Sequence, residues 1–334
     1  MKPKILTTLE LPKNALDALE KYFIVEGGPE LVKDRNKLLK LLEDKVGLLT
    51  APHIKVDREL FDHAPNLMVV STYSVGFDHI DVNEATRRGI YIGYTPGVLS
   101  DCVAEVTWAL ILSTYKRISE AERIVRARKW VKGIYKEPLG RDLKGKTLGI
   151  IGLGRIGRRV AEIGRCFGMR IVYYDIVKPP EAEKLDFEYC DLETLLKISD
   201  VVSIHVPLLK ETYHLIDESK LKLMKKDAII VNTSRGAVID EKALIRALKE
   251  GWIMGAGLDV FEQEPLPLDS ELLDMENVVL SPHRGSASIE TREAMLNLAV
   301  NNLISVLKGQ KPPALLNPDV MKVRPLDKTR VLQE

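Results

Sequence analysis

Cysteine is scarce in this sequence, and Cys102, Cys166 and Cys190 form no CxxC pair or other metal-binding spacing. An odd number of scattered cysteines argues against a disulfide framework. The simplest interpretation of each is a small buried apolar residue, and a reactive or ligand thiol is the alternative. No apolar run reaches the ~20 residues that a membrane helix needs. The N-terminal stretch MKPKILTTLELP also lacks the apolar core of a signal peptide. We therefore expect a cytoplasmic protein with no membrane partner and no bound metal.

Neither sign of charge predominates. Lys and Arg together number 49, and Asp and Glu number 48, in a chain of 334 residues. This balance gives no reason to expect nucleic acid as a partner. The hydrophobic share of 45% and the charged share of 29% are typical of a globular protein. At ~100–200 residues per domain, the length indicates two domains.

Strands alternate with helices along the chain, without an internal repeat, and this alternation predicts parallel α/β sheets. We expect a long helix over 101–128, which lacks Pro and Gly, a surface loop over 130–145, and a further helix over 288–308. The expected strands are 4–7, 46–50, 67–71 and 90–93 in a first α/β unit, and 147–151, 170–174, 201–205, 228–232, 255–259 and 278–281 in a second.

A glycine motif follows the first strand of the second unit. Gly152, Gly154 and Gly157 form G-x-G-x-x-G, with Arg155 and Ile156 inside it, between an apolar strand and an amphipathic helix. That context is the one a dinucleotide-binding turn requires. The first glycine permits the turn, the second lets the backbone approach a pyrophosphate, and the third lets helix and strand pack closely. The motif therefore predicts a dinucleotide site.

Asp175 ends the next expected strand, ~20 residues after the last glycine of the motif. An acid at this place accepts hydrogen bonds from the hydroxyls of the adenine ribose. It also repels a 2′-phosphate, because both groups are negative. We therefore expect NAD as the cofactor, with NADH preferred over NADPH.

Four residues that carry reactive or charged groups stand at, or just after, expected strand ends of the second unit: Arg235, Asp259, Glu264 and His283. Active sites of open α/β sheets gather at the C-terminal ends of strands. Taken singly, an arginine there commonly makes a surface ion pair, a loop glutamate is solvated, and a histidine is satisfied within the core. Their joint placement favours a catalytic site.

These segments resemble the D-isomer-specific 2-hydroxyacid dehydrogenase family, and most closely its glyoxylate/hydroxypyruvate reductase branch. The resemblance implies an NAD-dependent enzyme that moves a hydride between NAD(H) and the 2-position of a small D-2-hydroxy or 2-keto acid. The matching segments are STYSVGFDHID, GYTPGVLSDCVAE, GIIGLGRIG, HVPLLKETYHLI, NTSRGAVID, GAGLDVFEQEPLP and SPHRGSAS, which span roughly residues 70–290.

The resemblance implies a role for each candidate. His283 would be the acid/base, because imidazole exchanges a proton near neutral pH. Glu264 would hold its other ring nitrogen and favour imidazolium. Arg235 would grip the substrate carboxylate and polarise the 2-oxo oxygen. Backbone amides of Val75 and Gly76 would hold the other side of the carboxylate, so the implied substrate-binding residues are Val75, Gly76, Arg235 and His283.

The resemblance also implies cofactor contacts beyond the glycine motif, with Asp259 beside the nicotinamide. The implied cofactor-lining positions are Thr107, His205, Val206, Pro207, Thr212, Thr233, Ser234, Arg235, Asp259 and His283. The fold implied is two Rossmann-like parallel-sheet domains with an active-site cleft between them. The substrate-binding domain would be 1–100 plus 287–334, and the NAD-binding domain 101–286. A homodimer is expected through the helix that follows Ser100.

Two departures and two alternative functions stay open. Arg284 stands where many relatives carry an aliphatic residue; it would favour a larger anionic substrate, or it points away and pairs with an acid. His53 would recognise a distal substituent, or it is a rim residue without a role. The alternative functions are a 3-phosphoglycerate dehydrogenase-like enzyme and an NAD-sensing, corepressor-like binding protein. A formate dehydrogenase is disfavoured, because that branch has Gln at the position of Glu264.

Overall fold

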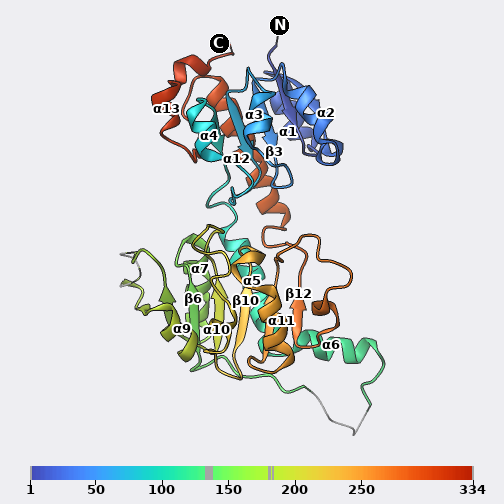
Figure 1. The fold of residues 1–334 in the computed structure, drawn as a ribbon, viewed down its shortest axis with the longest axis vertical. Helices are drawn as coiled ribbons and strands as arrows, with labels where there is room; N and C mark the ends of the chain where they lie inside the picture. Colours follow the sequence, from blue (N-terminus) through green and yellow to red (C-terminus); the bar gives the residue numbers. More distant parts are fainter. Residues whose placement is uncertain (1, 132–137, 180–181, 183, 333–334) are drawn as a thin grey trace. The chain divides into compact units, whose positions relative to one another are not determined.

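The computed structural model describes residues 2–131, 138–179, 182 and 184–332, so part of the loop expected over 130–145 lies outside the described residues. The chain divides into two compact units: unit 1 is Met1–Leu99 with Ser288–Glu334, and unit 2 is Ser100–Ala287. Each unit contains one parallel sheet with helices packed on it (Figure 1), which confirms the expected fold class. Within the described part of the chain, no helix has the length and apolar character to cross a bilayer.

Unit 1 has a five-stranded parallel sheet in the order β2-β1-β3-β4-β5. Its strands are β1 (Lys4–Thr7), β2 (Ile24–Gly27), β3 (Gly47–Thr50), β4 (Val69–Thr72) and β5 (Tyr91–Gly93), and its helices are α1 (Lys13–Glu20), α2 (Arg35–Leu42), α3 (Arg58–Asp62), α4 (Val82–Arg87), α12 (Ile289–Leu307) and α13 (Val320–Val323). The central strands β3 and β4 are buried along their whole length, as their continuous apolar runs predict. The edge strand β2 is partly exposed and was missed, because an edge strand needs no such run.

Helix α12 returns the chain to unit 1. Ser71 in β4 donates a hydrogen bond to the Ala299 carbonyl at 2.7 Å, and Asn302 donates one to the Tyr94 carbonyl at 2.9 Å. Ser71, Ala299 and Asn302 are buried and Tyr94 is half-buried, so solvent has little access to these bonds. The C-terminal tail is therefore an integral part of unit 1.

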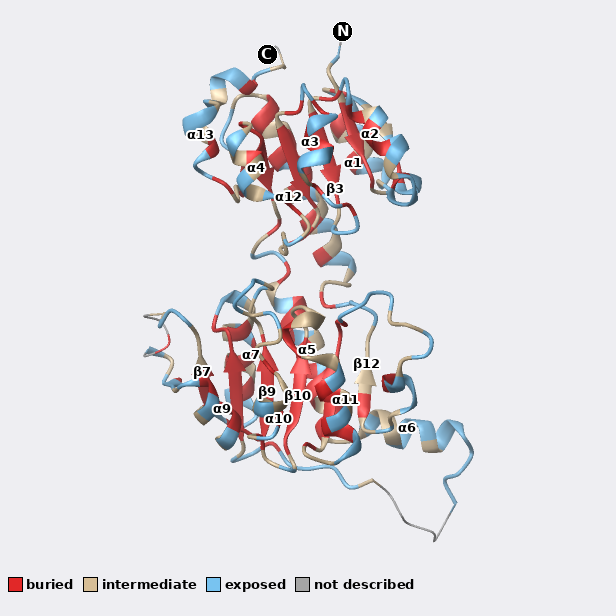
Figure 2. Cartoon of the chain, in the orientation of Figure 1, coloured by how far each residue is buried: buried red, intermediate tan, exposed pale blue. Residues whose placement is uncertain are grey.

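Unit 2 has a seven-stranded parallel sheet in the order β12-β11-β10-β9-β6-β7-β8. Its strands are β6 (Thr147–Ile151), β7 (Arg170–Tyr174), β8 (Glu188–Tyr189), β9 (Val201–Ile204), β10 (Ile229–Asn232), β11 (Gly255–Leu258) and β12 (Val278–Leu280), and its helices are α5 (Ser100–Tyr115), α6 (Ile118–Arg126), α7 (Arg155–Cys166), α9 (Leu192–Ile198), α10 (Glu218–Leu221) and α11 (Glu241–Lys249). The central strands form the buried layer (Figure 2). The strand order reverses between β6 and β9, which is where ligands bind in open α/β sheets.

The prediction of a single helix over 101–128 is wrong, because the helix is interrupted between α5 and α6. Arg117, between them, has a left-handed φ of 57°. The Tyr115 carbonyl accepts a hydrogen bond from the Arg141 N–H at 2.9 Å, a partner far along the chain, instead of the N–H of the next helical turn. Helical periodicity does not reveal such a tertiary contact.

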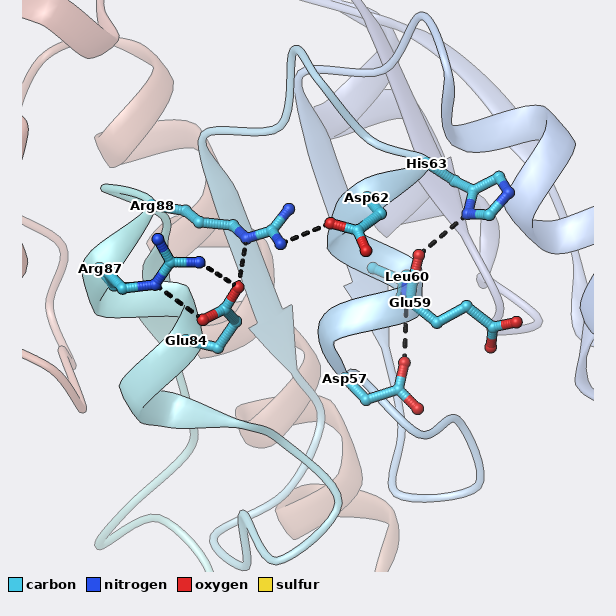
Figure 3. A network of polar contacts seen from close by, with 8 residues as sticks. All are labelled: Asp57, Glu59, Leu60, Asp62, His63, Glu84, Arg87 and Arg88. Carbon is cyan, nitrogen blue, oxygen red and sulfur yellow. Dashed lines mark hydrogen bonds and ion pairs between the residues drawn. The ribbon is translucent and has the colours of Figure 1, made fainter.

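An ion-pair network covers the surface of unit 1 between α3 and α4 (Figure 3). Arg87 and Arg88 both donate to Glu84, at 2.6 to 2.9 Å, and Arg88 also reaches Asp62 at 2.5 Å. The hydrogen bonds from Arg87 and Arg88 lower the pKa of Glu84 to about 2. The network therefore links two neighbouring helices through a carboxylate that stays ionised in moderate acid.

We expect Glu84→Gln to lower the thermal unfolding midpoint at pH 7. The pKa of Glu84 is depressed from 4.5 to about 2 in the folded state. The contribution of Glu84 to the free energy of unfolding is therefore full above the pKa of the unfolded chain, and it is lost as the pH falls from that pKa to the folded one. The difference between wild type and variant should therefore shrink as the pH falls from 4.5 toward 2. Glu293→Gln, at an exposed glutamate of α12, is the control. A pH-independent difference would contradict the ionic origin.

Candidate active site

The glycine motif forms the turn between β6 and α7. Gly152 has a φ of 93°, and a Cβ there would lie 2.9 Å from the backbone of His205 and from Val206. A Cβ on Gly157 would lie 2.1 Å from the Gly152 carbonyl oxygen. At Gly154, the N-cap residue of α7, nothing lies within 4 Å of an added Cβ. The turn therefore leaves open space above free helix N–H groups, which suits a pyrophosphate.

Asp175 lies directly beside this turn, after β7. Its Oδ2 accepts a hydrogen bond from the Leu153 N–H at 2.7 Å, and its Oδ1 accepts one from the Val177 N–H at 3.3 Å. The carboxylate is thereby fixed at the edge of the glycine turn while both oxygens keep a lone pair for ribose hydroxyls. Arg155 is exposed and Ile156 is half-buried in the first turn of α7.

The segment after β9 is held by local hydrogen bonds. Thr212 donates to the Pro207 carbonyl at 2.6 Å and accepts from the Leu209 N–H at 2.7 Å. The ring Nε2 of His205 is 2.8 Å from the hydroxyl of Ser203. Burial lowers the pKa of His205 to about 3, so this ring stays neutral at physiological pH. His205 is thus a poor proton donor and serves to line the turn.

The segment after β10 carries Arg235 in a fixed backbone. The Asn232 side chain accepts hydrogen bonds from the N–H and hydroxyl of Ser234 at 3.0 and 2.9 Å, and it donates to the Arg235 carbonyl at 2.8 Å. The hydroxyls of Thr233 and Thr107 meet at 2.9 Å, which joins this segment to α5. The sequence motif NTSRG therefore encodes its own turn.

Glu264 and His283, which the resemblance implies as an acid–base pair, lie in hydrogen-bonding contact. Nδ1 of His283 is 2.7 Å from Oε2 of Glu264, and Oε1 of Glu264 accepts the Phe261 N–H at 3.1 Å. Burial raises the pKa of Glu264, but the hydrogen bond and charge of His283, the Phe261 N–H and the charge of Arg235 together leave it below its usual value. An ionised carboxylate at this place accepts a hydrogen bond from Nδ1–H, which leaves Nε2 outside this pair.

Asp259 positions the turn that carries His283. Its side chain is 1% exposed, and its two oxygens accept the N–H groups of Arg284 and Gly285 at 2.7 and 2.8 Å. Its carbonyl accepts the His283 N–H at 2.8 Å, and His283 has a left-handed φ of 51°. The sequence predicts Asp259 as a cofactor neighbour but does not reveal this clamp, which holds the histidine in an unusual backbone conformation.

A second histidine–glutamate pair, which the sequence did not single out, joins two site segments. Nε2 of His214 is 2.7 Å from Glu262 Oε1, which also accepts the Glu241 N–H at 3.0 Å. Burial, and to a lesser extent the charge of Glu262, raises the pKa of Glu241. His214, Glu262 and Asp240 bring one ligand-type atom each within 4.8 Å of one another. The internal hydrogen bonds explain this cluster as a brace, because they tie the loop before His283 to the start of α11.

The remaining predicted residues belong to other segments of the chain. Val75 and Gly76 follow β4 in unit 1. His53 is exposed after β3, and the Arg284 side chain is exposed, with no acidic partner among the residues that the structure describes. The interpretation of Arg284 as an ion-pair residue thus has no support here, and the roles of His53 and Arg284 stay predictions.

A glycine turn of this shape receives a dinucleotide, and an imidazole fixed by a carboxylate transfers a proton. A site with both belongs to a nicotinamide-dependent dehydrogenase, which must move a hydride and a proton together. The sequence model described as "D-isomer specific 2-hydroxyacid dehydrogenase, NAD binding domain" matches residues 108–285. The chain belongs to the D-isomer-specific 2-hydroxyacid dehydrogenase family, which confirms the resemblance seen in the sequence.

Three relatives illustrate this membership. A glyoxylate reductase of Thermofilum pendens is 52% identical, over 99% of either chain. The D-lactate dehydrogenase of Aquifex aeolicus, solved with NAD and lactic acid, is 33% identical with a TM-score of 0.82, over 91% of this chain and 95% of that one. An NADPH-dependent glyoxylate/hydroxypyruvate reductase of Sinorhizobium meliloti, solved with NADP and malonate, is 31% identical with a TM-score of 0.83, over 100% and 99%. The chain is thus an NAD-dependent D-2-hydroxyacid dehydrogenase.

Proposed function

We propose that this enzyme reduces glyoxylate to glycolate, and hydroxypyruvate to D-glycerate, with NADH as the hydride donor. The observation that carries the proposal is the 2.7 Å pair of Glu264 and His283 beside the charge of Arg235. The full-length relative from Thermofilum pendens, named a glyoxylate reductase, supports the choice of substrate. The test is NADH oxidation with glyoxylate, hydroxypyruvate, pyruvate and 3-phosphohydroxypyruvate. A higher kcat/KM for either of the last two would overturn the substrate assignment.

In this mechanism His283 provides the proton. When bound, the reduced nicotinamide supplies a hydride to the 2-carbon of the keto acid. His283 Nε2 donates a proton to the 2-oxygen as negative charge develops there, and it takes the proton back in the reverse reaction. The ionised Glu264 holds Nδ1–H and stabilises the imidazolium that reduction requires. The Asp259 clamp keeps the ring in place without direct contact with its nitrogens.

The substrate carboxylate, in this proposal, is bound by Arg235 and by the backbone of Val75 and Gly76. A guanidinium presents two parallel N–H donors that match a carboxylate, and its charge also polarises the adjacent 2-oxo group. The Asn232 hydrogen bonds fix the Arg235 backbone, so less conformational entropy is lost when the substrate binds.

NADH is preferred over NADPH in this proposal because Asp175 is fixed at the edge of the glycine turn. A 2′-phosphate on the adenine ribose would meet a carboxylate that is already held by the Leu153 N–H. Ribose hydroxyls, in contrast, donate hydrogen bonds to it. The relative from Sinorhizobium meliloti was solved with NADP, so the preference of this chain for NADH over NADPH has to be measured directly.

We expect Asp175→Asn to reduce the ratio of kcat/KM for NADH to that for NADPH by about tenfold, which corresponds to ~1.4 kcal/mol. Asparagine removes the charge but keeps an acceptor for the Leu153 N–H, so the turn itself is preserved. Asp191→Asn, which neutralises an exposed N-cap acid of α9 in the same unit, is the matched control. An unchanged ratio of kcat/KM for NADH to that for NADPH in Asp175→Asn would show that the charge of Asp175 does not set the cofactor preference.

We further propose a homodimer that buries α6. This helix has no buried residue in the single chain, and its apolar Ile118 and Val125 are 57% and 55% exposed. Large apolar side chains on one helix face mark a surface that a partner covers. Sedimentation of the intact protein should give the mass of two chains, and Val125→Glu should give that of one. A monomeric wild type would refute the proposal.

A further inference from the structure

Buried polar side chains form hydrogen bonds with one another and with the backbone of the turn that follows β4 in unit 1. The Ser74 hydroxyl donates to the Gly76 carbonyl at 2.6 Å. The hydroxyls of Thr72 and Ser74 are 3.0 Å apart, and the Thr72 hydroxyl is 3.1 Å from Nε2 of His79. Thr72 is 0% exposed and Ser74 is 7% exposed. Because water has little access, these groups depend on one another for their hydrogen bonds.

The donor in each of these bonds follows from counting hydrogens. A carbonyl only accepts, so the single hydrogen of the Ser74 hydroxyl is used on Gly76. The Thr72 hydroxyl must then donate to Ser74, and His79 must donate its Nε2–H to Thr72. The result is a relay that runs in one direction, from His79 through Thr72 and Ser74 to the Gly76 carbonyl. Hydrogen bonds in such a chain polarise and strengthen one another.

The relay, together with one backbone hydrogen bond, sets the direction of two backbone N–H groups in the turn. In a trans peptide the C=O and the N–H of the next residue point in opposite directions. The Ser74 carbonyl is held by the Thr95 N–H at 2.9 Å, and the Gly76 carbonyl is held by the relay. The Val75 N–H therefore points away from the Thr95 N–H, and the Phe77 N–H points away from the Ser74 hydroxyl. Among the residues that the structure describes, the N–H groups of residues 75–77 donate no hydrogen bond.

We propose that Ser74 and Thr72 are positioning residues for substrate binding: by fixing the Gly76 carbonyl, the relay holds the turn in which the N–H groups of Val75 and Phe77 receive the substrate carboxylate. Successive unpaired N–H groups in a turn form a concave site for an anion. A carboxylate of the substrate is an anion that fits this requirement. The inference rests on the proposed function and extends it, because it names side chains that act through the backbone without touching the substrate.

The first test is Ser74→Ala, which removes the donor to the Gly76 carbonyl. We expect KM for glyoxylate to rise about fivefold, the effect of one buried hydrogen bond. kcat for glyoxylate and KM for NADH should stay within about twofold, since the lost interaction binds the carboxylate of the acid equally in the ground state and in the transition state. The Kd of oxamate, an unreactive analogue of glyoxylate, should rise by the same factor in the NADH complex. That readout does not depend on turnover.

A second pair of variants tests the relay itself. Thr72→Val keeps the shape but breaks the chain between His79 and Ser74, so KM should again rise, and Thr72→Ser, which restores a hydroxyl, should bring it back. Ser71→Ala is the matched control. It lies on the same strand, β4, and removes a buried hydrogen bond to the Ala299 carbonyl of α12, but it does not contact the turn.

The outcomes separate this inference from the proposed function. If the wild type does not reduce glyoxylate, the proposed substrate is wrong, and the relay is then judged with the keto acid that is turned over. If Ser74→Ala and Thr72→Val bind NADH yet keep KM and the oxamate Kd within twofold of wild type, the relay has no positioning role. An equal rise in Ser71→Ala would attribute the effect to general loosening of β4 and would also overturn the proposal.

Discussion

We expect His283→Asn to lower kcat for glyoxylate reduction by about 1000-fold, within the range that general acid catalysis contributes. The proton for the 2-oxygen comes from Nε2, and asparagine has no group that releases a proton near neutral pH. Asparagine is chosen because position 283 has a φ of 51°, a left-handed conformation that Asn tolerates better than Ala. Stopped-flow measurement of NADH oxidation gives kcat, and NADH fluorescence gives cofactor binding, which should persist.

The chain provides its own control for this experiment. His214 also has a left-handed backbone, with a φ of 49°, and its Nε2 also lies 2.7 Å from a glutamate, Glu262. His214→Asn should therefore cost a similar loss of local packing but less than about tenfold in kcat, because no proton is transferred there. A His283→Asn variant that kept a tenth of wild-type kcat, or a His214→Asn variant as slow as it, would refute the acid role of His283.

The central sheets and the glycine turn are predictable from the sequence because their signals are local. A strand buried on both faces needs a continuous apolar run, and a dinucleotide turn needs glycines at fixed spacing. The edge strands β2 and β8 escape prediction because their residues are partly or fully exposed. The break at Arg117 escapes it too, since the hydrogen bond from Arg141 to the Tyr115 carbonyl joins segments that only the folded chain brings together.

The candidate site shows the same division. The identities of Glu264 and His283 follow from motifs, and the structure places their side chains in contact. What the motifs do not reveal is how the histidine turn is held, because the Asp259 carboxylate acts on backbone N–H groups that any sequence would offer. The relay beneath the turn after β4 is equally hidden, since Thr72 and Ser74 are common residues whose meaning depends on their neighbours in space.

Arg235→Lys should lower kcat/KM for glyoxylate by about 100-fold, because truncating one partner of a desolvated charge pair costs roughly 2–5 kcal/mol. Lysine keeps the positive charge, but its ammonium group cannot make the two parallel hydrogen bonds that a planar guanidinium makes to a carboxylate. The larger part of the loss should appear in KM, since the substrate carboxylate is bound in the ground state as well as in the transition state. Initial rates over a range of glyoxylate concentrations at saturating NADH measure both parameters.

Arg235→Gln separates charge from shape. The positive charge of Arg235 helps to keep the pKa of Glu264 low, so its removal should raise that pKa as well as weaken substrate binding. When Glu264 takes up a proton at a higher pH, it loses the negative charge that stabilises the imidazolium of His283. The acid limb of the pH–rate profile should therefore move to higher pH in Arg235→Gln but not in Arg235→Lys. Arg246→Lys, at an arginine of α11 that pairs with Glu218, is the matched control. If Arg235→Lys left KM within twofold of wild type, Arg235 would act through its charge on Glu264 alone, and the carboxylate would have to bind elsewhere.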